Sequence, residues 1–286
     1  MTQSAVRPQS QDGGSRSADL TIRIAENGSR GANVETPSAV RGPSSAVDRS
    51  LQTVDMPINM GPQHPSTHGV FRMLLTVDGE RVIDVEPVIG YLHRGSEKLC
   101  EVNRYLQCVP LMDRLDYVSA FNNELAYVMA VERLMQIEVP QRAEYVRVIL
   151  CELNRLASHF MFYGAFGEDV GLSTPFLYGF RERERLQLIF EEVTGARMNH
   201  NWFRIGGLKE DVPSNFVERV NETLPLIEQG IADCDSLLTE NEIFVERTRG
   251  VGVISAEDAI DYGLSGPALR GSGVPYDVRT ALPYSV

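Results

Sequence analysis

The stretch QRAEYVRVILCELNRLASHFMFYGAF, residues 141–166, decides the fold, because its apolar residues recur every three or four positions. This spacing places them on one face of an α-helix, and Pro140 suits the first turn of such a helix. A helix this long with one apolar stripe needs neighbouring elements to cover the stripe. The stripe consists of Val146, Ile149, Leu150, Leu153, Leu156, Ala157 and Phe160.

Similar patterns on both sides of this stretch predict further helices. Ser96 can cap a helix over residues 96–107, and Val118, Phe121, Leu125 and Val128 form a second apolar stripe. The sequence Thr-Pro at 174–175 predicts the start of a helix that runs to Thr-Gly at 194–195. Another helix is expected over 215–238, and a capping box at 255–258 predicts a short one near the end.

The segment 51–95 has the pattern of strands instead. LQTVDMPINM, GVFRMLLTV and RVIDVEPVIG are strand-like, and DGE at 78–80 predicts a hairpin turn between the last two. The predicted fold class is therefore α+β, with a small N-terminal antiparallel sheet over 51–95 and a bundle of long helices over 96–286. We expect the bundle to be incomplete at its C-terminus, because ALPYSV offers no closing element.

Composition excludes several classes of function. Residues 1–50 are rich in Ser, Gly, Arg and Pro, which predicts a disordered extension. The net charge of −12 disfavours nucleic acid as a partner. No apolar run reaches the roughly 18 residues that a transmembrane segment needs. The four cysteines lack CxxC or CxxH spacing, so we expect free thiols in a reducing compartment and no metal site.

Four clusters carry side chains suited to chemistry, and each alone has a structural alternative. GPQHPSTHG at 61–69 is a rigid turn, which either exposes its histidines or presents His68 to a ligand. In DRLDYVS at 113–119 the polar residues either cap a helix or let Tyr117 bind a flat carbonyl compound. Asp169 is expected in a turn between two helices, and His200 in a loop that is either packed or functional.

The order of these clusters along the chain resembles a known family. GPQHPSTHG, GYLHRGSEK, DRLDY, ELNRLASH, TPF with FRERE, RIGG with KED, RTRGVGV and GSGVPYDVR follow one another between residues 59 and 285. This series is similar to the 49-kDa-type (D-type) subunit of respiratory NADH:quinone oxidoreductase, complex I. That family is in turn similar to the large subunit of nickel–iron hydrogenases, so the resemblance implies a hydrogenase-like fold.

The resemblance also implies which residues act. Where hydrogenases carry two metal-binding cysteines, this chain has Asp116 and Ser119, which do not replace soft thiolates. The former metal pocket is expected to hold a quinone headgroup, with His68 and Tyr117 as its hydrogen-bonding residues and Asp169 as the partner of His68. Arg114 and a charged or hydrogen-bonding His200 are expected near the terminal 4Fe-4S cluster of a neighbouring subunit.

The expected function is therefore quinone reduction, coupled to proton translocation, as one peripheral-arm subunit of complex I. The chain itself is expected to bind no cofactor and no metal, with quinone as substrate. Expected partners are the subunit with the terminal 4Fe-4S cluster, a C-type subunit and membrane-arm subunits. The expected location is the cytoplasmic face of a bacterial plasma membrane, with the matrix side of the mitochondrial inner membrane as the second choice. Two alternatives stay open: a related oxidoreductase that uses F420H2 or ferredoxin, and a non-catalytic truncated scaffold.

Overall fold

The computed structural model of the chain describes residues 54–64, 67–283 and 285–286. The extension predicted to be disordered, residues 1–50, lies outside the described residues. So do residues 51–53 of the predicted β region and residues 65 and 66 of the GPQHPSTHG turn.

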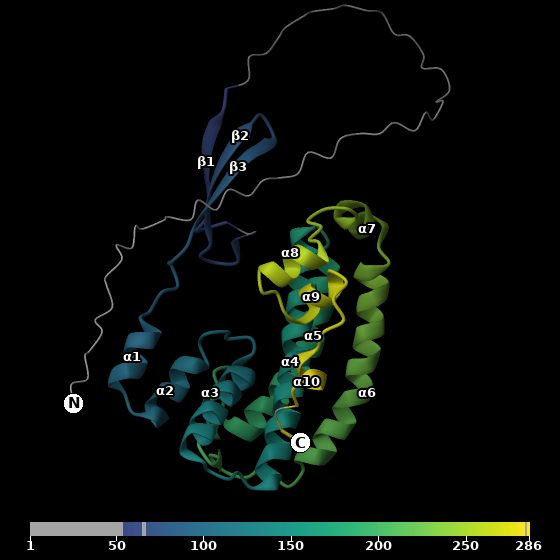
Figure 1. Cartoon of the computed structure of the whole chain (residues 1–286). Coiled ribbons are helices and arrows are strands. Elements are labelled where there is room, and N and C mark those ends of the chain that lie inside the picture. Colours follow the sequence, from purple (N-terminus) through teal and green to yellow (C-terminus); the bar gives the residue numbers. More distant parts are fainter. Residues whose placement is uncertain (1–53, 65–66, 284) are drawn as a thin grey trace, which may run out of the picture. The chain divides into compact units, whose positions relative to one another are not determined.

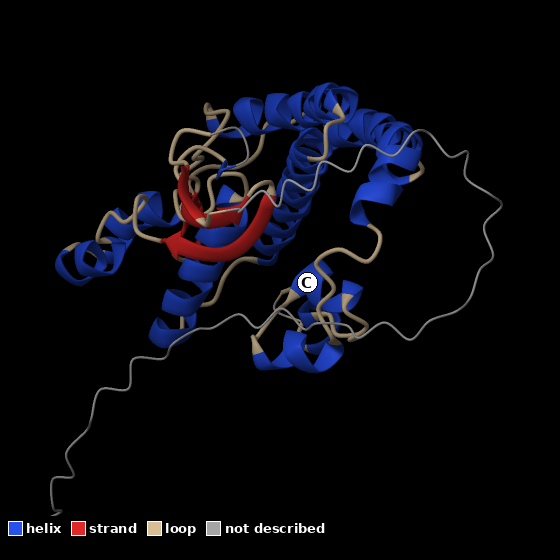
Figure 2. Cartoon of the chain, turned by 90° about the horizontal axis from the view of Figure 1, so that it is seen from above, coloured by secondary structure: helices blue, strands red, loops and turns tan. Residues whose placement is uncertain are grey.

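The predicted antiparallel sheet is confirmed in the described part of the chain. Strands β1 (Met56–Met60), β2 (Arg72–Asp78) and β3 (Arg81–Val88) pair in the order β1-β2-β3, and β2 and β3 form a hairpin at Gly79. The register places Ile58 opposite Leu75 and Leu75 opposite Val85, so apolar side chains share one face of the sheet. Figure 2 shows the strands in red and the helices in blue.

Helices form most of the remaining structure (Figure 1). Two short strands, β4 (Phe203–Arg204) and β5 (Gly207–Leu208), pair with each other between α5 and α6. The helices are α1 (Ser96–Val102), α2 (Tyr105–Met112), α3 (Ala120–Met135), α4 (Gln141–Asp169), α5 (Ser173–Thr194), α6 (Phe216–Cys234) with its π-helical continuation η2 (Asp235–Thr239), α7 (Glu242–Thr248), α8 (Ala256–Asp261), α9 (Gly266–Gly271) and α10 (Val278–Ala281).

The long helices pack as the apolar stripes predict. Helix α4 packs against both α3 and α5, and α5 also packs on α6. The helices α4 and α5 approach closely because Gly179 has no Cβ atom. A Cβ at this position would lie only 2.6 Å from the carbonyl oxygen of Phe160. Leu150, Leu186, Trp202 and Phe203 are buried in the shared core.

Three details of the predicted helices are wrong. The helix expected over 96–107 is two helices, because the backbone of Asn103 is extended (φ −94°, ψ 160°). The residue before α1 is Gly95 in the left-handed region (φ 64°), so Ser96 lies inside the helix and does not cap it. Asp169 is the last residue of α4, where a turn was expected. The predicted cap at Ser255 is confirmed, since its side chain accepts a hydrogen bond from the Asp258 amide.

Candidate functional site

The turn that carries His68 is built around one buried hydroxyl. Thr67 is almost fully buried, and its Oγ1 donates to the carbonyl oxygens of Pro62 (3.1 Å) and His64 (2.9 Å). Gly61 has φ +85°, and a Cβ there would lie 2.1 Å from the carbonyl oxygen of Phe71, so only glycine fits without a backbone shift. His68 itself adopts φ 48°, an uncommon value for a residue with a side chain. The turn therefore holds His68 in a defined backbone conformation.

The structure brings His68 and Asp169 together. Nε2 of His68 lies 3.1 Å from Oδ2 of Asp169, although the two residues are 101 positions apart in the chain. The His68 side chain is 64% exposed and the Asp169 side chain 29% exposed. The carboxylate orients the imidazole, while the high exposure keeps the free energy of the pair small. The imidazole is thus oriented and still open to a ligand.

Tyr117 lies in the segment between α2 and α3 and is 47% exposed. Its turn is fixed by the carbonyl oxygen of Asp116, which accepts from the Ser119 amide (3.0 Å) and from Nδ2 of Asn123 (2.9 Å). Among the described residues the Tyr117 hydroxyl has no hydrogen bond, so the structure does not join it to His68 or Asp169. The hydroxyl is therefore available to an external ligand.

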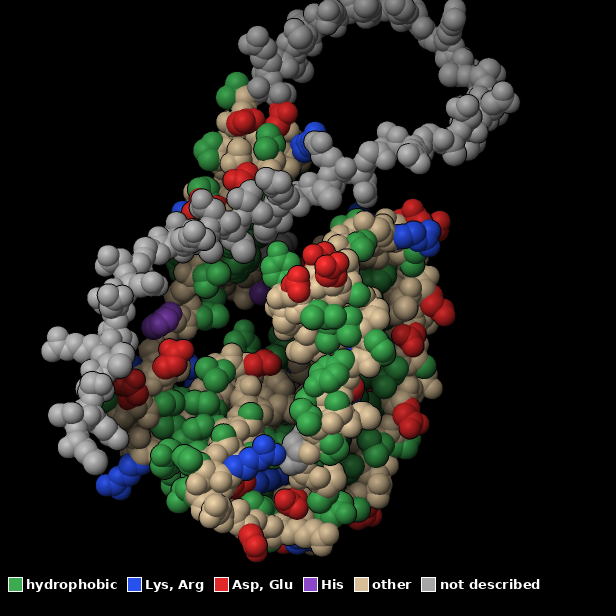
Figure 3. Space-filling view, viewed as in Figure 1, with side chains coloured by type: hydrophobic (Ala, Val, Ile, Leu, Met, Phe, Trp, Pro, Cys, Tyr) green, Lys and Arg blue, Asp and Glu red, His purple; other side chains and the backbone are tan. Residues whose placement is uncertain are grey.

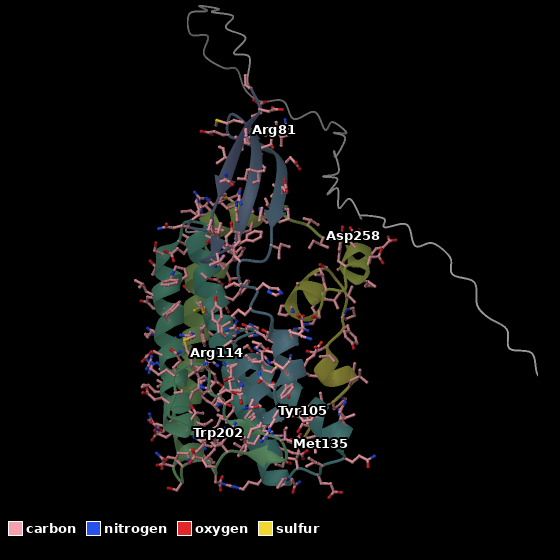
Figure 4. All side chains as sticks on the ribbon, turned by 90° about the vertical axis from the view of Figure 1, so that its left-hand side faces the viewer. Arg81, Tyr105, Arg114, Met135, Trp202 and Asp258 are labelled. Carbon is pink, nitrogen blue, oxygen red and sulfur yellow. The ribbon has the colours of Figure 1, made fainter. Side chains whose placement is uncertain are left out.

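Arg114 belongs to the same segment (Figure 4) and is partly exposed. Its Nη1 donates to the carbonyl oxygen of Pro110 at 2.7 Å and lies 3.9 Å from Oδ2 of the buried Asp113. These contacts hold the guanidinium on the α2 side of the segment. The structure thus fixes Arg114 from within the chain while leaving part of its side chain exposed.

His200 is buried, unlike His68. Its ring stacks on Phe121 (centroids 4.0 Å apart) and meets the edge of Phe190, while Nδ1 lies 3.2 Å from the carbonyl oxygen of Ala196. Burial lowers the pKa of His200 to about 4. The imidazole is therefore neutral at pH 7, so of the two forms expected from the resemblance, charged or hydrogen-bonding, only the second fits this structure.

The RIGG motif that follows His200 is anchored by a buried ion pair. Arg147 on α4 donates to both carboxylate oxygens of Glu132 on α3, at 2.6 and 3.1 Å. Arg147 also donates to the carbonyl oxygens of Arg204 and Gly207, both at 2.8 Å, and Glu132 accepts from the Gly206 amide at 2.7 Å. These bonds attach the strands β4 and β5 to the α3–α4 pair.

Two polar residues outside the four sequence clusters position parts of the site. Asn154 on α4 accepts from the Phe121 amide and donates to the carbonyl oxygen of Val118, both at 3.1 Å, which fixes the start of α3 next to Tyr117. Glu124 is fully buried on α3. Their positions in the sequence could have indicated this role. Asn154 and Glu124 fall among the apolar residues of their helices, where a buried polar side chain needs a hydrogen-bond partner.

A pocket in the described part of the chain lies elsewhere. It has a volume of about 780 Å³ and is lined by residues of α3, α4 and the segment 265–279, including Met129, Arg155, His159 and Arg270, and not by His68, Tyr117 or Asp169. The residues 54–64, 67–283 and 285–286 contain no group of three His, Cys, Asp or Glu side chains placed to hold a metal ion. Within the same residues no helix is both long and apolar enough to cross a bilayer.

Comparisons with known proteins identify relatives. Residues 169–286 match the family described as "Respiratory-chain NADH dehydrogenase, 49 Kd subunit". The chain is 55% identical over 230 residues to the D subunit of the NADH-quinone oxidoreductase of Geotalea uraniireducens, covering 80% of this chain and 59% of that protein. It is 53% identical over 230 residues to that of Geobacter sulfurreducens, covering 80% of this chain and 59% of the relative. It is 49% identical over 239 residues to that of Clostridium beijerinckii, covering 84% and 65%.

These alignments leave part of each relative uncovered. The chain spans about three fifths of the length of the curated relatives it matches. Over the residues that it shares with them, the chain is similar to the 49-kDa subunit family of the respiratory-chain NADH dehydrogenase and to D subunits of NADH-quinone oxidoreductases.

Proposed function

We propose that this chain is part of the quinone-binding subunit of a proton-translocating NADH:quinone oxidoreductase, and that it forms the quinone headgroup pocket next to the terminal 4Fe-4S cluster of a neighbouring subunit. The observation that carries the proposal is the contact of His68 Nε2 with Asp169 Oδ2 at 3.1 Å, made by an imidazole that stays exposed. The names of the relatives supply the reaction, since they are NADH-quinone oxidoreductase subunits.

The proposed chemistry needs proton donors and no metal from this chain. Reduction of a quinone to a quinol takes two electrons, which arrive from the partner's cluster, and two protons. A donor has to lie within about 3 Å of a carbonyl oxygen to deliver a proton. The hydroxyl of Tyr117 and the imidazole of His68 fit this role, and Asp169 orients the imidazole of His68.

Arg114 and His200 are proposed to face the partner's cluster. The reduced cluster carries more negative charge, so the guanidinium of Arg114 stabilises it and raises its potential. His200 acts as a neutral, hydrogen-bonding residue in this proposal, because burial keeps its pKa at about 4. The Ala196 carbonyl and the Phe121 ring hold the imidazole in one orientation.

Other subunits are proposed to cover part of the helical surface. Large apolar side chains gather over α1 to α3 (Figure 3), and their exposure is unusual for an isolated soluble surface. They include Val102, Tyr105, Leu106, Leu134 and Met135, each more than half exposed. We propose the cluster-bearing subunit, a C-type subunit and membrane-arm subunits as the partners, in a complex on the cytoplasmic face of the membrane.

The experiment is a substitution of Tyr117 in the assembled complex. Tyr117→Phe keeps the ring and removes the hydroxyl, so quinone reduction should slow at least tenfold, while NADH still reduces the upstream iron–sulfur clusters. Tyr145→Phe is the matched control, because Tyr145 is also about half exposed and lies on α4. Unchanged turnover in Tyr117→Phe would remove Tyr117 from the mechanism.

Two further measurements decide between the proposal and its alternatives. A quinone-competitive inhibitor should bind the wild-type complex, whereas failure to bind would favour a non-catalytic scaffold. Reduction of the clusters by F420H2 or ferredoxin in place of NADH would favour a related oxidoreductase with another electron donor.

A further inference from the structure

Two acidic side chains lie completely inside the helical core. Asp113 follows α2, Glu124 lies in the second turn of α3, and both are fully buried. Oδ2 of Asp113 accepts from the Asn201 amide at 2.9 Å, and Oε2 of Glu124 accepts from the amides of Trp202 (2.9 Å) and Phe203 (2.7 Å). The two carboxyl groups, called here the carboxyl pair, thus bind three consecutive N–H groups directly after His200.

The other oxygen of each carboxyl group is buried without an N–H partner. Oδ1 of Asp113 and Oε1 of Glu124 accept no hydrogen bond from any other group in the described part of the chain. A buried carboxylate oxygen without a partner is costly, and two carboxylates side by side repel each other. One proton shared between the two groups removes both problems, because one carboxyl then donates to the other.

The positive charges near the pair favour the ionised form of Asp113, although burial raises the pKa of that carboxyl group. Nη1 of Arg114 lies 3.9 Å from Oδ2 of Asp113. The positive charge of Arg204 also favours the ionised form of Asp113. On the side of α4, Glu124 interacts with the buried Cys151 thiol, and Arg147 is paired with Glu132. His200 is neutral at pH 7. Burial and the neighbouring Asp113 raise the pKa of Glu124 to about 9, so Glu124 carries the proton.

We propose that Asp113 and Glu124 share one proton at neutral pH and act as positioning residues for His200 and Arg114. Asp113 contacts the Arg114 guanidinium, and together the pair fixes the three amides after His200. Both side chains that are proposed to face the partner's cluster are therefore oriented by the same pair. This part of the inference rests on the proposed function, whereas the shared proton does not.

The shared proton makes the stability of the chain depend on pH in a defined direction. The unfolded chain has an ordinary glutamate with a pKa near 4.3, and the folded chain holds the proton up to about pH 9. The contribution is therefore complete below pH 4.3 or so and is lost as the pH rises toward 9. Over that range the equilibrium constant for unfolding should rise by up to about tenfold per pH unit on account of Glu124.

Glu124→Gln tests the proton on the full chain. The glutamine oxygen can still accept from the Trp202 and Phe203 amides, and its NH₂ group can donate to Asp113, so the variant imitates the protonated state. Between pH 5 and 9 the free energy of unfolding of Glu124→Gln should depend less on pH than that of the wild-type chain, because the contribution of Glu124 is removed. Glu138→Gln changes an exposed glutamate and should keep the wild-type pH dependence. An unchanged pH dependence in Glu124→Gln would overturn the proposal.

Infrared spectroscopy of the wild-type chain tests the shared proton even if Glu124→Gln does not fold. The wild-type chain at pH 7 should show the C=O stretch of a protonated carboxyl group, and its absence would overturn the shared proton. Asp113→Asn serves as the second variant, and this band should change in it.

The positioning role needs a separate readout in the assembled complex. Glu124→Ala removes the acceptor for two amides and should shift the midpoint potential of the partner's cluster, whereas Glu124→Gln should leave it near the wild-type value at pH 7. Equal potentials in all three proteins would overturn the positioning role while leaving the shared proton intact. A chain that lacks the proposed quinone function would still show the infrared band, so the two failures are distinguishable.

Discussion

The two histidines of the proposed site occupy opposite environments. The His68 side chain is 64% exposed and pairs with one carboxylate, whereas His200 is buried between aromatic rings and has a pKa of about 4. The first region is held by the single buried hydroxyl of Thr67, and the second by the carboxyl pair and by the ion pair of Arg147 with Glu132. Burial therefore separates an exposed histidine from one that stays neutral at pH 7.

The comparison predicts that substitutions around His200 change stability far more than those around His68. Arg147→Leu leaves Glu132 as an unpaired buried charge and removes hydrogen bonds to β4 and β5. We expect a loss of about 3–5 kcal/mol in the free energy of unfolding, or no folded chain at all. Urea denaturation followed by circular dichroism measures it.

The control for this prediction is an ion pair on the surface. Arg142 pairs with Asp211 at 3.1 Å, and both side chains are mostly exposed. Arg142→Leu should therefore change the free energy of unfolding far less than Arg147→Leu. Losses of equal size in the two variants would contradict the importance that we give to burial.

The second prediction concerns acid. The unfolded chain binds a proton at His200 with a pKa near 6.5, and the folded chain resists it down to about pH 4. Stability is therefore complete above pH 6.5 or so and falls with pH toward 4. His200→Met should reduce the loss of stability between pH 6.5 and 4, because the contribution of His200 is removed. His93→Met changes an exposed histidine and should lose stability in acid as the wild-type chain does. Unfolding midpoints between pH 4 and 7 measure the difference.

The same variant tests the placement of His200 in the complex. His200→Met removes a hydrogen-bonding group from the proposed neighbourhood of the partner's cluster, so the midpoint potential of that cluster should fall. A redox titration that shows no shift would count against the placement.

The third prediction compares two glycines in the His68 turn. A Cβ at Gly61 would meet the carbonyl oxygen of Phe71 at 2.1 Å, whereas a Cβ at Gly69 would meet nothing within 4 Å. Both have positive φ values, so Gly69→Ala measures the backbone strain alone. Gly61→Ala should cost about 1–3 kcal/mol more than Gly69→Ala, by thermal unfolding. Equal losses of stability in the two variants would mean that the backbone of the turn shifts to accommodate a Cβ atom at Gly61.

The sequence predicts the long helices well because their pattern is local. The stripe from Val146 to Phe160 has the period of a helix, and the structure buries it. The break at Asn103 has no such signal, since neither glycine nor proline marks it.

The site was less predictable because its contacts join distant parts of the chain. His68 and Asp169 are 101 positions apart, and only the family resemblance suggested their pairing. The burial of His200 depends on Phe121 and Phe190, which belong to two other helices. Glu124 could have been noticed, since it lies three positions after Phe121 on the buried face of α3.

The smallest change in stability is expected at the His68 pair itself. Asp169→Asn keeps the shape of the side chain and removes the negative charge that lies 3.1 Å from Nε2 of His68. Because His68 is mostly exposed, the free energy of unfolding should change by less than about 1 kcal/mol. Quinone reduction by the assembled complex should nevertheless fall severalfold or more, since a proton donor is weakened. Glu168→Gln, at the neighbouring exposed carboxylate of α4, is the control and should leave turnover unchanged. If Asp169→Asn lost stability and kept its turnover, the proposed role of Asp169 in quinone reduction would be wrong, because Asp169 would then support the fold and not the chemistry.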